Sequence, residues 1–107
     1  MSPTSAPEYL YLTTIGWRTG KPHEIEIWFT EFEGRFYLVS ELGHRAHWVQ
    51  NVERQSEVSF QVGRRTYQGK GRVVDPQHDP ELHARAWQLS IQKYGWGEGL
   101  GVELREE

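Results

Sequence analysis

Residues Leu12–Asn51 carry most of the information about the architecture, and they read LTTIGWRTGKPHEIEIWFTEFEGRFYLVSELGHRAHWVQN. A strand-like run ends at a glycine-rich turn over residues 15–22, and strands with alternating apolar and polar side chains follow it. These strands are hinged at Glu33-Gly34, a pair that suits a tight hairpin. Residues 40–43 then lead into a helix start. The turn and the helix start concentrate cations and backbone N–H groups, so the stretch is equipped to hold an anionic ligand.

The rest of the chain continues the pattern of short strands. We expect strands over residues 9–14, 23–30, 35–40, 57–62 and 65–74, and a short helix over residues 46–54. Asp79 as N-cap, Pro80 in the first turn and Gly95 at the end delimit a second helix. Its two apolar stripes indicate contact with its own barrel and with a partner chain. About six antiparallel strands with two helices predict a mainly β, α+β fold, a small closed or half-closed barrel.

Length, charge and cysteine content exclude several classes of protein. The 107 residues predict one domain over residues 1–107, with a loose arm at residues 1–7 and a glycine-rich acidic tail at residues 95–107 whose path the sequence leaves open. A net charge of -3 gives no global signature of nucleic-acid binding. The absence of cysteine excludes disulfides, thiolate metal sites and a cysteine nucleophile. No apolar run has membrane-spanning length and no signal peptide is visible, so we expect a cytoplasmic protein.

Three blocks of sequence, in this order, resemble one known family. The first is Thr13-Thr14-Ile15-Gly16-Trp17-Arg18-Thr19-Gly20-Lys21-Pro22, the second runs from Tyr37-Leu38-Val39-Ser40 to Trp48-Val49-Gln50-Asn51, and the third covers residues 56–67. Together they are similar to the deazaflavin (F420)-dependent nitroreductase or quinone reductase family. That family belongs to the split β-barrel group typified by pyridoxamine 5'-phosphate oxidase.

The resemblance implies a homodimer with a cofactor groove near the subunit interface. It also implies an oxidoreductase that passes a hydride from the reduced deazaflavin to a quinone, a nitroaromatic or an activated alkene. Three departures from the family pattern concern the groove: Trp17 replaces a basic residue, Glu41 replaces a lysine, and the loop lacks a proline before Trp48. An FMN-dependent reductase of the same fold therefore stays open, as does a binding protein for flavin, haem or lipid without turnover.

The candidate cofactor-binding residues lie in the turn, on the following strand and around the first helix. They are Arg18, Thr19, Lys21, Glu26, Trp28, Ser40, Gly43, His44, Arg45, Trp48 and Asn51. The turn residues and those at the helix start would hold phosphate and acidic groups, and a flat indole could stack on a tricyclic ring. Each group also has a purely structural alternative. The turn residues could simply be solvated, and the residues at the helix start could be an ordinary cap region. Trp28 could pack in a dimer interface, and the Asn51 amide could fix the loop.

No metal site and no single proton donor stands out. His23, His44 and His47 have no acidic partner at convincing ligand spacing, so we do not expect a bound metal. Tyr9, Tyr11, Tyr67 and Tyr94 are equivalent candidates for donating a proton to a reduced substrate. A missing acid–base pair is no argument against an enzyme here, because the cofactor carries the chemistry of hydride transfer.

Overall fold

A computed structural model describes residues 9–107, so the predicted arm at residues 1–7 lies outside the described part of the chain. Within it, seven strands and two helices follow one another, with a short 3₁₀ turn, η1, over Gly43–Arg45. The strands are β1 (Tyr9–Ile15), β2 (Pro22–Trp28), β3 (Thr30–Phe32), β4 (Arg35–Ser40), β5 (Glu57–Val62), β6 (Arg65–Val73) and β7 (Leu100–Glu106). The helices are α1 (His47–Arg54) and α2 (Pro80–Tyr94).

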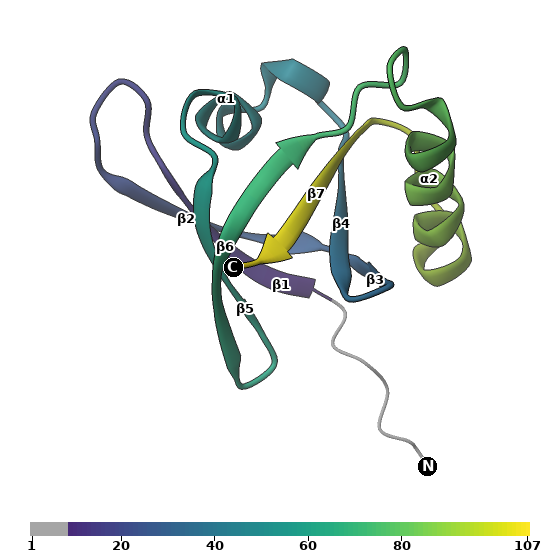
Figure 1. Cartoon of the computed structure of the whole chain (residues 1–107), viewed down its shortest axis with the longest axis horizontal. Helices are drawn as coiled ribbons and strands as arrows, with labels where there is room; N and C mark the ends of the chain where they lie inside the picture. Colours follow the sequence, from purple (N-terminus) through teal and green to yellow (C-terminus); the bar gives the residue numbers. More distant parts are fainter. Residues whose placement is uncertain (1–8) are drawn as a thin grey trace.

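All seven strands belong to one curled antiparallel sheet in the order β2-β1-β5-β6-β7-β4-β3 (Figure 1). The two strands at the ends of this order, β2 and β3, are consecutive in the chain and are separated by Phe29 alone. The chain therefore passes from one edge of the sheet to the other within one residue, which requires the sheet to curl until its edges approach. The result is the predicted half-closed barrel.

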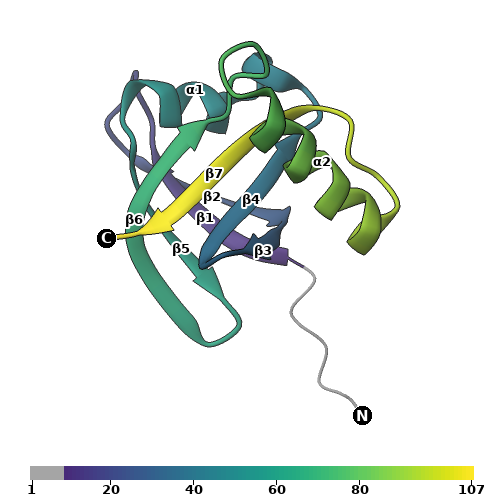
Figure 2. The same cartoon turned by 45° about the vertical axis from the view of Figure 1, so that its right-hand side comes forward.

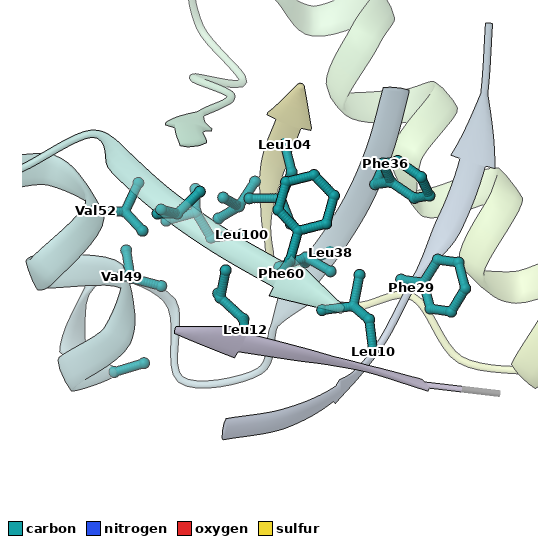
Figure 3. Close-up of a cluster of buried hydrophobic side chains, with 13 residues drawn as sticks. Leu10, Leu12, Phe29, Phe36, Leu38, Val49, Val52, Phe60, Leu100 and Leu104 are labelled. Atoms are coloured by element: carbon teal, nitrogen blue, oxygen red, sulfur yellow. The ribbon is translucent and has the colours of Figure 1, made fainter. Parts of the chain in front are cut away.

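The core fills the inside of this curl. On β1, Leu10, Leu12 and Thr14 are buried and alternate with more exposed residues, as the pleat requires. The buried cluster draws side chains from the strands and from α1 (Figure 3), and Phe36 packs edge-on against Phe60 with ring centroids 5.3 Å apart. Helix α1 covers one end of the barrel with its buried face. Residues 40–46, which lead into this helix, therefore lie across from β2.

Two parts of the chain differ from the sequence-based expectation. Residues 95–107 were expected to form a tail, but Leu100–Glu106 is strand β7, which lies between β6 and β4 inside the sheet. The glycines of this segment hid the strand pattern; Gly99, just before β7, has a φ of 156°, and a Cβ there would clash with the Ser40 carbonyl oxygen. The strand predicted over residues 23–30 is interrupted at Phe29, and Thr30–Phe32 forms the separate strand β3; β3 and β7 together bring the five predicted strand ranges to seven strands.

Helix α2 covers the outer face of β4 and β7 (Figure 2). As predicted, Asp79 precedes it, Pro80 opens it and Gly95 ends it with a φ of 77°. The Asp79 carboxylate lies 3.8 Å from the Arg72 guanidinium instead of bonding the helix end. His83 is buried beneath the helix, and its Nε2 accepts a hydrogen bond from the Gly101 N–H at 3.1 Å. Burial lowers the pKa of His83, which favours the neutral imidazole that this bond needs.

A buried carboxylate lies on the outer face of the sheet, next to α2. Glu103 is 3% exposed, accepts a hydrogen bond from the Tyr37 hydroxyl at 2.9 Å, and pairs with Arg35 at 3.3 Å and Arg72 at 3.4 Å. Burial, followed by the bond to Glu103, raises the pKa of Tyr37 to about 12. These contacts explain how a central strand can carry a buried charge.

No helix in the described part of the chain is long and apolar enough to cross a membrane.

Candidate functional site

An open groove of about 1540 Å³ runs between β2 on one side and η1 with the start of α1 on the other. Most of the candidate residues line it: Arg18, Thr19, Glu26, Trp28, Ser40, Arg45, Trp48 and Asn51. Lys21, Gly43 and His44 lie outside the lining. The structure thus brings together residues from the turn, the strand and the first helix, as the sequence analysis predicted.

The three residues outside the lining have local partners. The Lys21 backbone N–H bonds the Thr19 hydroxyl at 3.2 Å, and His44 Nδ1 lies 3.1 Å from a carboxylate oxygen of Glu53. Gly43 has a φ of 61°, and its C=O accepts a hydrogen bond from the Ser40 hydroxyl at 3.1 Å. Gly43 and His44 belong to the 3₁₀ turn η1, so they precede α1 rather than open it.

Asn51 fastens the β1–β2 hairpin to α1. The Asn51 side chain is 6% exposed; its Oδ1 accepts a hydrogen bond from the Trp17 backbone N–H at 3.2 Å, and its Nδ2 donates to the Thr14 hydroxyl at 3.0 Å. The side chain is therefore occupied by protein partners although it lines the groove. This is the loop-fixing alternative that the sequence left open.

The end of the groove nearest the hairpin is rich in cations and donors. Arg18, His23, Arg45 and His47 line it, and within residues 9–107 neither of these arginines forms an ion pair. The first residues of α1 also line the groove, so backbone N–H groups at a helix start add to the positive potential. Three glutamates share the lining and offset part of this charge: Glu24, Glu26 and Glu41.

The opposite end of the groove is aromatic. Trp28 is stacked on Tyr94 with ring centroids 4.4 Å apart and an interplanar angle of 3°, and Trp96 lies edge-on at 6.4 Å. Trp28, Trp96 and Tyr9 line the groove. Because Trp28 is still 45% exposed, a large part of its surface is available to a ligand.

Strand β2 connects the two ends. It pairs with β1 along one edge, and its other edge has no strand partner among the described residues. Alternate backbone N–H and C=O groups along such an edge are available for hydrogen bonds. From His23 to Trp28 the strand extends for roughly 17 Å at about 3.3 Å per residue. A long ligand can thus contact the polar and the aromatic end together.

Sequence reasoning missed several lining residues. Tyr9, Trp17, His23 and His47 line the groove in addition to the candidates, as does Trp96. The strand and helix patterns could have indicated His23 and His47, but Trp96 follows α2 and reaches the groove through tertiary packing. No group of three histidine or carboxylate residues within residues 9–107 could hold a metal ion.

The tyrosines considered as proton donors have different surroundings. Tyr9 lines the groove, whereas Tyr67 packs in the core against Phe60 with ring centroids 5.0 Å apart. The Glu26 carboxylate opposite Tyr11 raises the pKa of that exposed phenol. The Tyr94 hydroxyl donates a hydrogen bond to the Phe29 C=O at 2.7 Å. Tyr9 is therefore the candidate that the groove can use.

Comparison with known proteins identifies the family. The model of the F420H(2)-dependent quinone reductase family matches residues 3–97, which include both walls of the groove. The chain belongs to this family. The F420H(2)-dependent quinone reductase family consists of oxidoreductases, and its cofactor is the deazaflavin F420. No curated protein matches the chain by sequence.

Solved structures confirm the split-barrel fold. A structure of an F420-H2 dependent reductase is 22% identical, with 92% of this chain and 94% of that chain covered and a TM-score of 0.73. A Listeria innocua protein provisionally described as a pyridoxamine 5'-phosphate oxidase is 17% identical, with 94% and 85% covered and a TM-score of 0.74. A heme storage protein from Vibrio cholerae is 16% identical, with 94% and 82% covered and a TM-score of 0.76.

The donor set of the groove fits the family's cofactor. Arg18 and Arg45 at the polar end suit phosphate and carboxylate groups, and Trp28 and Trp96 at the other end suit a flat ring system. A cofactor with anionic groups at one end and a tricyclic ring at the other therefore matches the two ends of the groove. When bound, F420 supplies the hydride that the reaction needs.

Proposed function

We propose that the protein is an F420-dependent reductase that binds the cofactor along β2 and passes a hydride to a small electrophile, namely a quinone, a nitroaromatic or an activated alkene. The observation that carries this proposal is the polarity of the groove, which has two arginines without an ion pair in residues 9–107 at one end and three aromatic residues at the other. Family membership supports the cofactor, and the aromatic end supports a flat, apolar substrate.

The chain's own residues have three tasks in this mechanism. Arg18 and Arg45 bind and orient anionic groups, so the position of the ring along β2 is fixed from the polar end. Trp28 forms a flat wall against which a ring can stack, and Ile27 beside it helps to exclude water from that part of the groove. Tyr9, which lines the aromatic end, is the proton donor to the reduced substrate in this proposal.

We also propose that two copies of the chain associate. The described part of the chain leaves Trp28, Leu42 and Ile91 exposed, and Trp28 and Leu42 both line the groove. Burying exposed apolar side chains of this size would favour association. Light scattering coupled to size exclusion should give twice the mass of 12.6 kDa, and the monomer mass would refute the dimer. The cytoplasmic location stays a prediction from the sequence.

The test of the proposed function is a titration with F420 and, separately, with FMN, followed by tryptophan fluorescence. Trp17, Trp28, Trp48 and Trp96 line the groove, so an occupied groove should quench the signal. We expect micromolar binding of F420, weaker binding of FMN, and oxidation of reduced F420 when a quinone or a nitroaromatic is added. Tight binding of FMN alone would assign the protein to the flavin-dependent alternative.

A haem-binding protein without turnover is the second candidate. His23 and His47 both line the groove, and neutral imidazole is a ligand for haem iron. Titration with haem distinguishes this possibility, because an axial imidazole gives a sharp shift of the Soret band. Binding of haem together with no oxidation of reduced F420 would replace the reductase by this second function.

A further inference from the structure

Trp17 at the tip of the β1–β2 hairpin gathers two arginines that are far apart in the sequence. The Cζ atoms of Arg18 and Arg54 lie 4.7 Å and 4.6 Å from the centroid of the Trp17 ring. Arg54 is the last residue of α1, and the Trp17 backbone N–H is bonded to Asn51 of the same helix at 3.2 Å. The hairpin tip is therefore fixed against α1, and both guanidinium groups lie against the ring of Trp17, which lines the groove.

Stacking on an indole leaves the hydrogen-bonding capacity of an arginine unused. A guanidinium that stacks face-on over a ring keeps its five N–H donors in its own plane, where they are directed away from the ring. Within residues 9–107, neither Arg18 nor Arg54 forms an ion pair, in contrast to Arg35, Arg65 and Arg72, which all do. Two cations are thus held on one indole that lines the groove; Arg18 belongs to the lining and Arg54 lies outside it, and neither has an ion-pair partner among residues 9–107.

The surrounding carboxylates form no ion pair with either arginine within residues 9–107, although Glu24, Glu26 and Glu41 in the groove lining offset part of the positive charge. Glu53, the residue before Arg54, pairs with His44 at 3.1 Å. Glu24 and Glu41 line the same groove as Trp17 and Arg18, but neither forms an ion pair within residues 9–107. The local arrangement is therefore suited to a ligand with several anionic groups, each of which can accept from a guanidinium group.

We propose that Arg18 and Arg54, positioned by Trp17, form a two-arginine site for the phosphate and carboxylate groups of the F420 tail. This inference rests on the proposed function and names the residues that select a cofactor with an anionic tail over one without. Arg54 lies outside the residues that the sequence indicated as candidates. Trp17, which brings no charge itself, contributes by fixing the position of two charged side chains.

Arg54→Met tests the site, because methionine keeps an apolar stem against Trp17 and removes the charge. Arg64→Met is the matched control: it makes the same change in net charge at the β5–β6 turn, away from the β1–β2 hairpin (Figure 1). The ligands are F420 and the deazaflavin nucleoside that lacks the phosphate and the glutamates. Affinities are measured by tryptophan fluorescence at low and at high salt.

We expect Arg54→Met to weaken F420 binding about tenfold at low salt, as loss of one charge-assisted hydrogen bond would. Binding of the nucleoside should be unchanged, and the salt dependence of F420 binding should become shallower. Trp17→Ala should match or exceed the loss seen in Arg54→Met, since it releases both arginines. Arg64→Met should bind both ligands as the wild type does.

Two results would overturn the two-arginine site. If Arg54→Met and Arg64→Met bind F420 equally, Arg54 does not contact the tail. If Arg54→Met weakens F420 and the nucleoside by the same factor, Arg54 only fastens the hairpin to α1. A wild-type protein that binds neither ligand would instead refute the proposed function itself, so the two failures are distinguishable.

Discussion

Replacing Tyr94 by phenylalanine removes one oxygen atom from the place where the barrel closes. Between β2 and β3 the chain leaves one edge of the sheet and joins the other, and Phe29 has no neighbouring strand to bond at this point. The Tyr94 hydroxyl takes that place: it accepts from the Phe29 N–H at 3.1 Å and donates to the Phe29 C=O at 2.7 Å. The last turn of α2 thus supplies the hydrogen bonds that a neighbouring strand would otherwise make with Phe29.

The expected loss of stability depends on whether the Phe29 N–H and the Phe29 C=O each keep a hydrogen-bond partner in Tyr94→Phe. Lys93 Nζ also donates to the Phe29 C=O at 2.9 Å, so the carbonyl stays satisfied in Tyr94→Phe. The Phe29 N–H loses its partner in a residue that is only 3% exposed. An unsatisfied buried donor costs about 1–3 kcal/mol. For a domain of this size we therefore expect Tm to fall by roughly 4–15 °C.

Thermal and urea denaturation followed by circular dichroism measure this loss. Tyr67→Phe is the control, because it also removes a phenolic oxygen, and that hydroxyl makes no hydrogen bond within residues 9–107. A Tyr94→Phe protein as stable as the control would refute the idea that Tyr94 closes the barrel. The phenyl ring that remains in Tyr94→Phe can still stack on Trp28, so the experiment isolates the hydroxyl.

Three further predictions concern buried polar groups. Asn51→Ala should cost about 1–3 kcal/mol and weaken cofactor binding, measured by urea denaturation and fluorescence titration, because it frees the hairpin from α1. Glu103→Gln should cost about 1–3 kcal/mol in urea denaturation, less than for a fully buried pair, since its two arginines are about half exposed. The wild-type protein should lose stability as pH falls below about 6.5, because the folded-state pKa of His83 is lowered and the unfolded chain binds the proton more tightly. In His83→Gln, whose amide oxygen can accept from Gly101, urea denaturation should show a flatter pH dependence in that window.

The parts of the fold that sequence predicts are those fixed by local chemistry. Alternation over residues 23–28 placed Ile25 and Ile27 toward the core, as found. The Glu33-Gly34 hairpin is confirmed, and both residues have the positive φ, 52° and 77°, that a type I′ turn requires. The second helix begins and ends where Pro80 and Gly95 predicted. Each of these features depends on neighbours within a few positions along the chain.

The parts that sequence did not predict depend on distant contacts. The break at Phe29 exists because a tyrosine 65 positions later supplies its hydrogen bonds. Strand β7 was hidden by the glycines before it, of which Gly99 is required because the Ser40 carbonyl oxygen lies too close for a side chain. The contact of Arg54 with Trp17 was missed because it joins a helix end to a hairpin tip. Local patterns contain no information about such pairs.

Closure of the barrel and the shape of the groove depend on the same few residues. Trp28 is the last residue of β2 and precedes the closing residue Phe29, and Tyr94 both stacks on Trp28 and bonds Phe29. Helix α2 lies on the outer face of the sheet, yet its last turn determines where the aromatic wall of the groove lies. Substitutions at the end of α2 should therefore alter ring binding without touching the polar end, whereas substitutions at Trp17 should do the reverse. The groove thus has two ends that can be changed separately, which is what a reductase needs to keep its cofactor while its substrate changes.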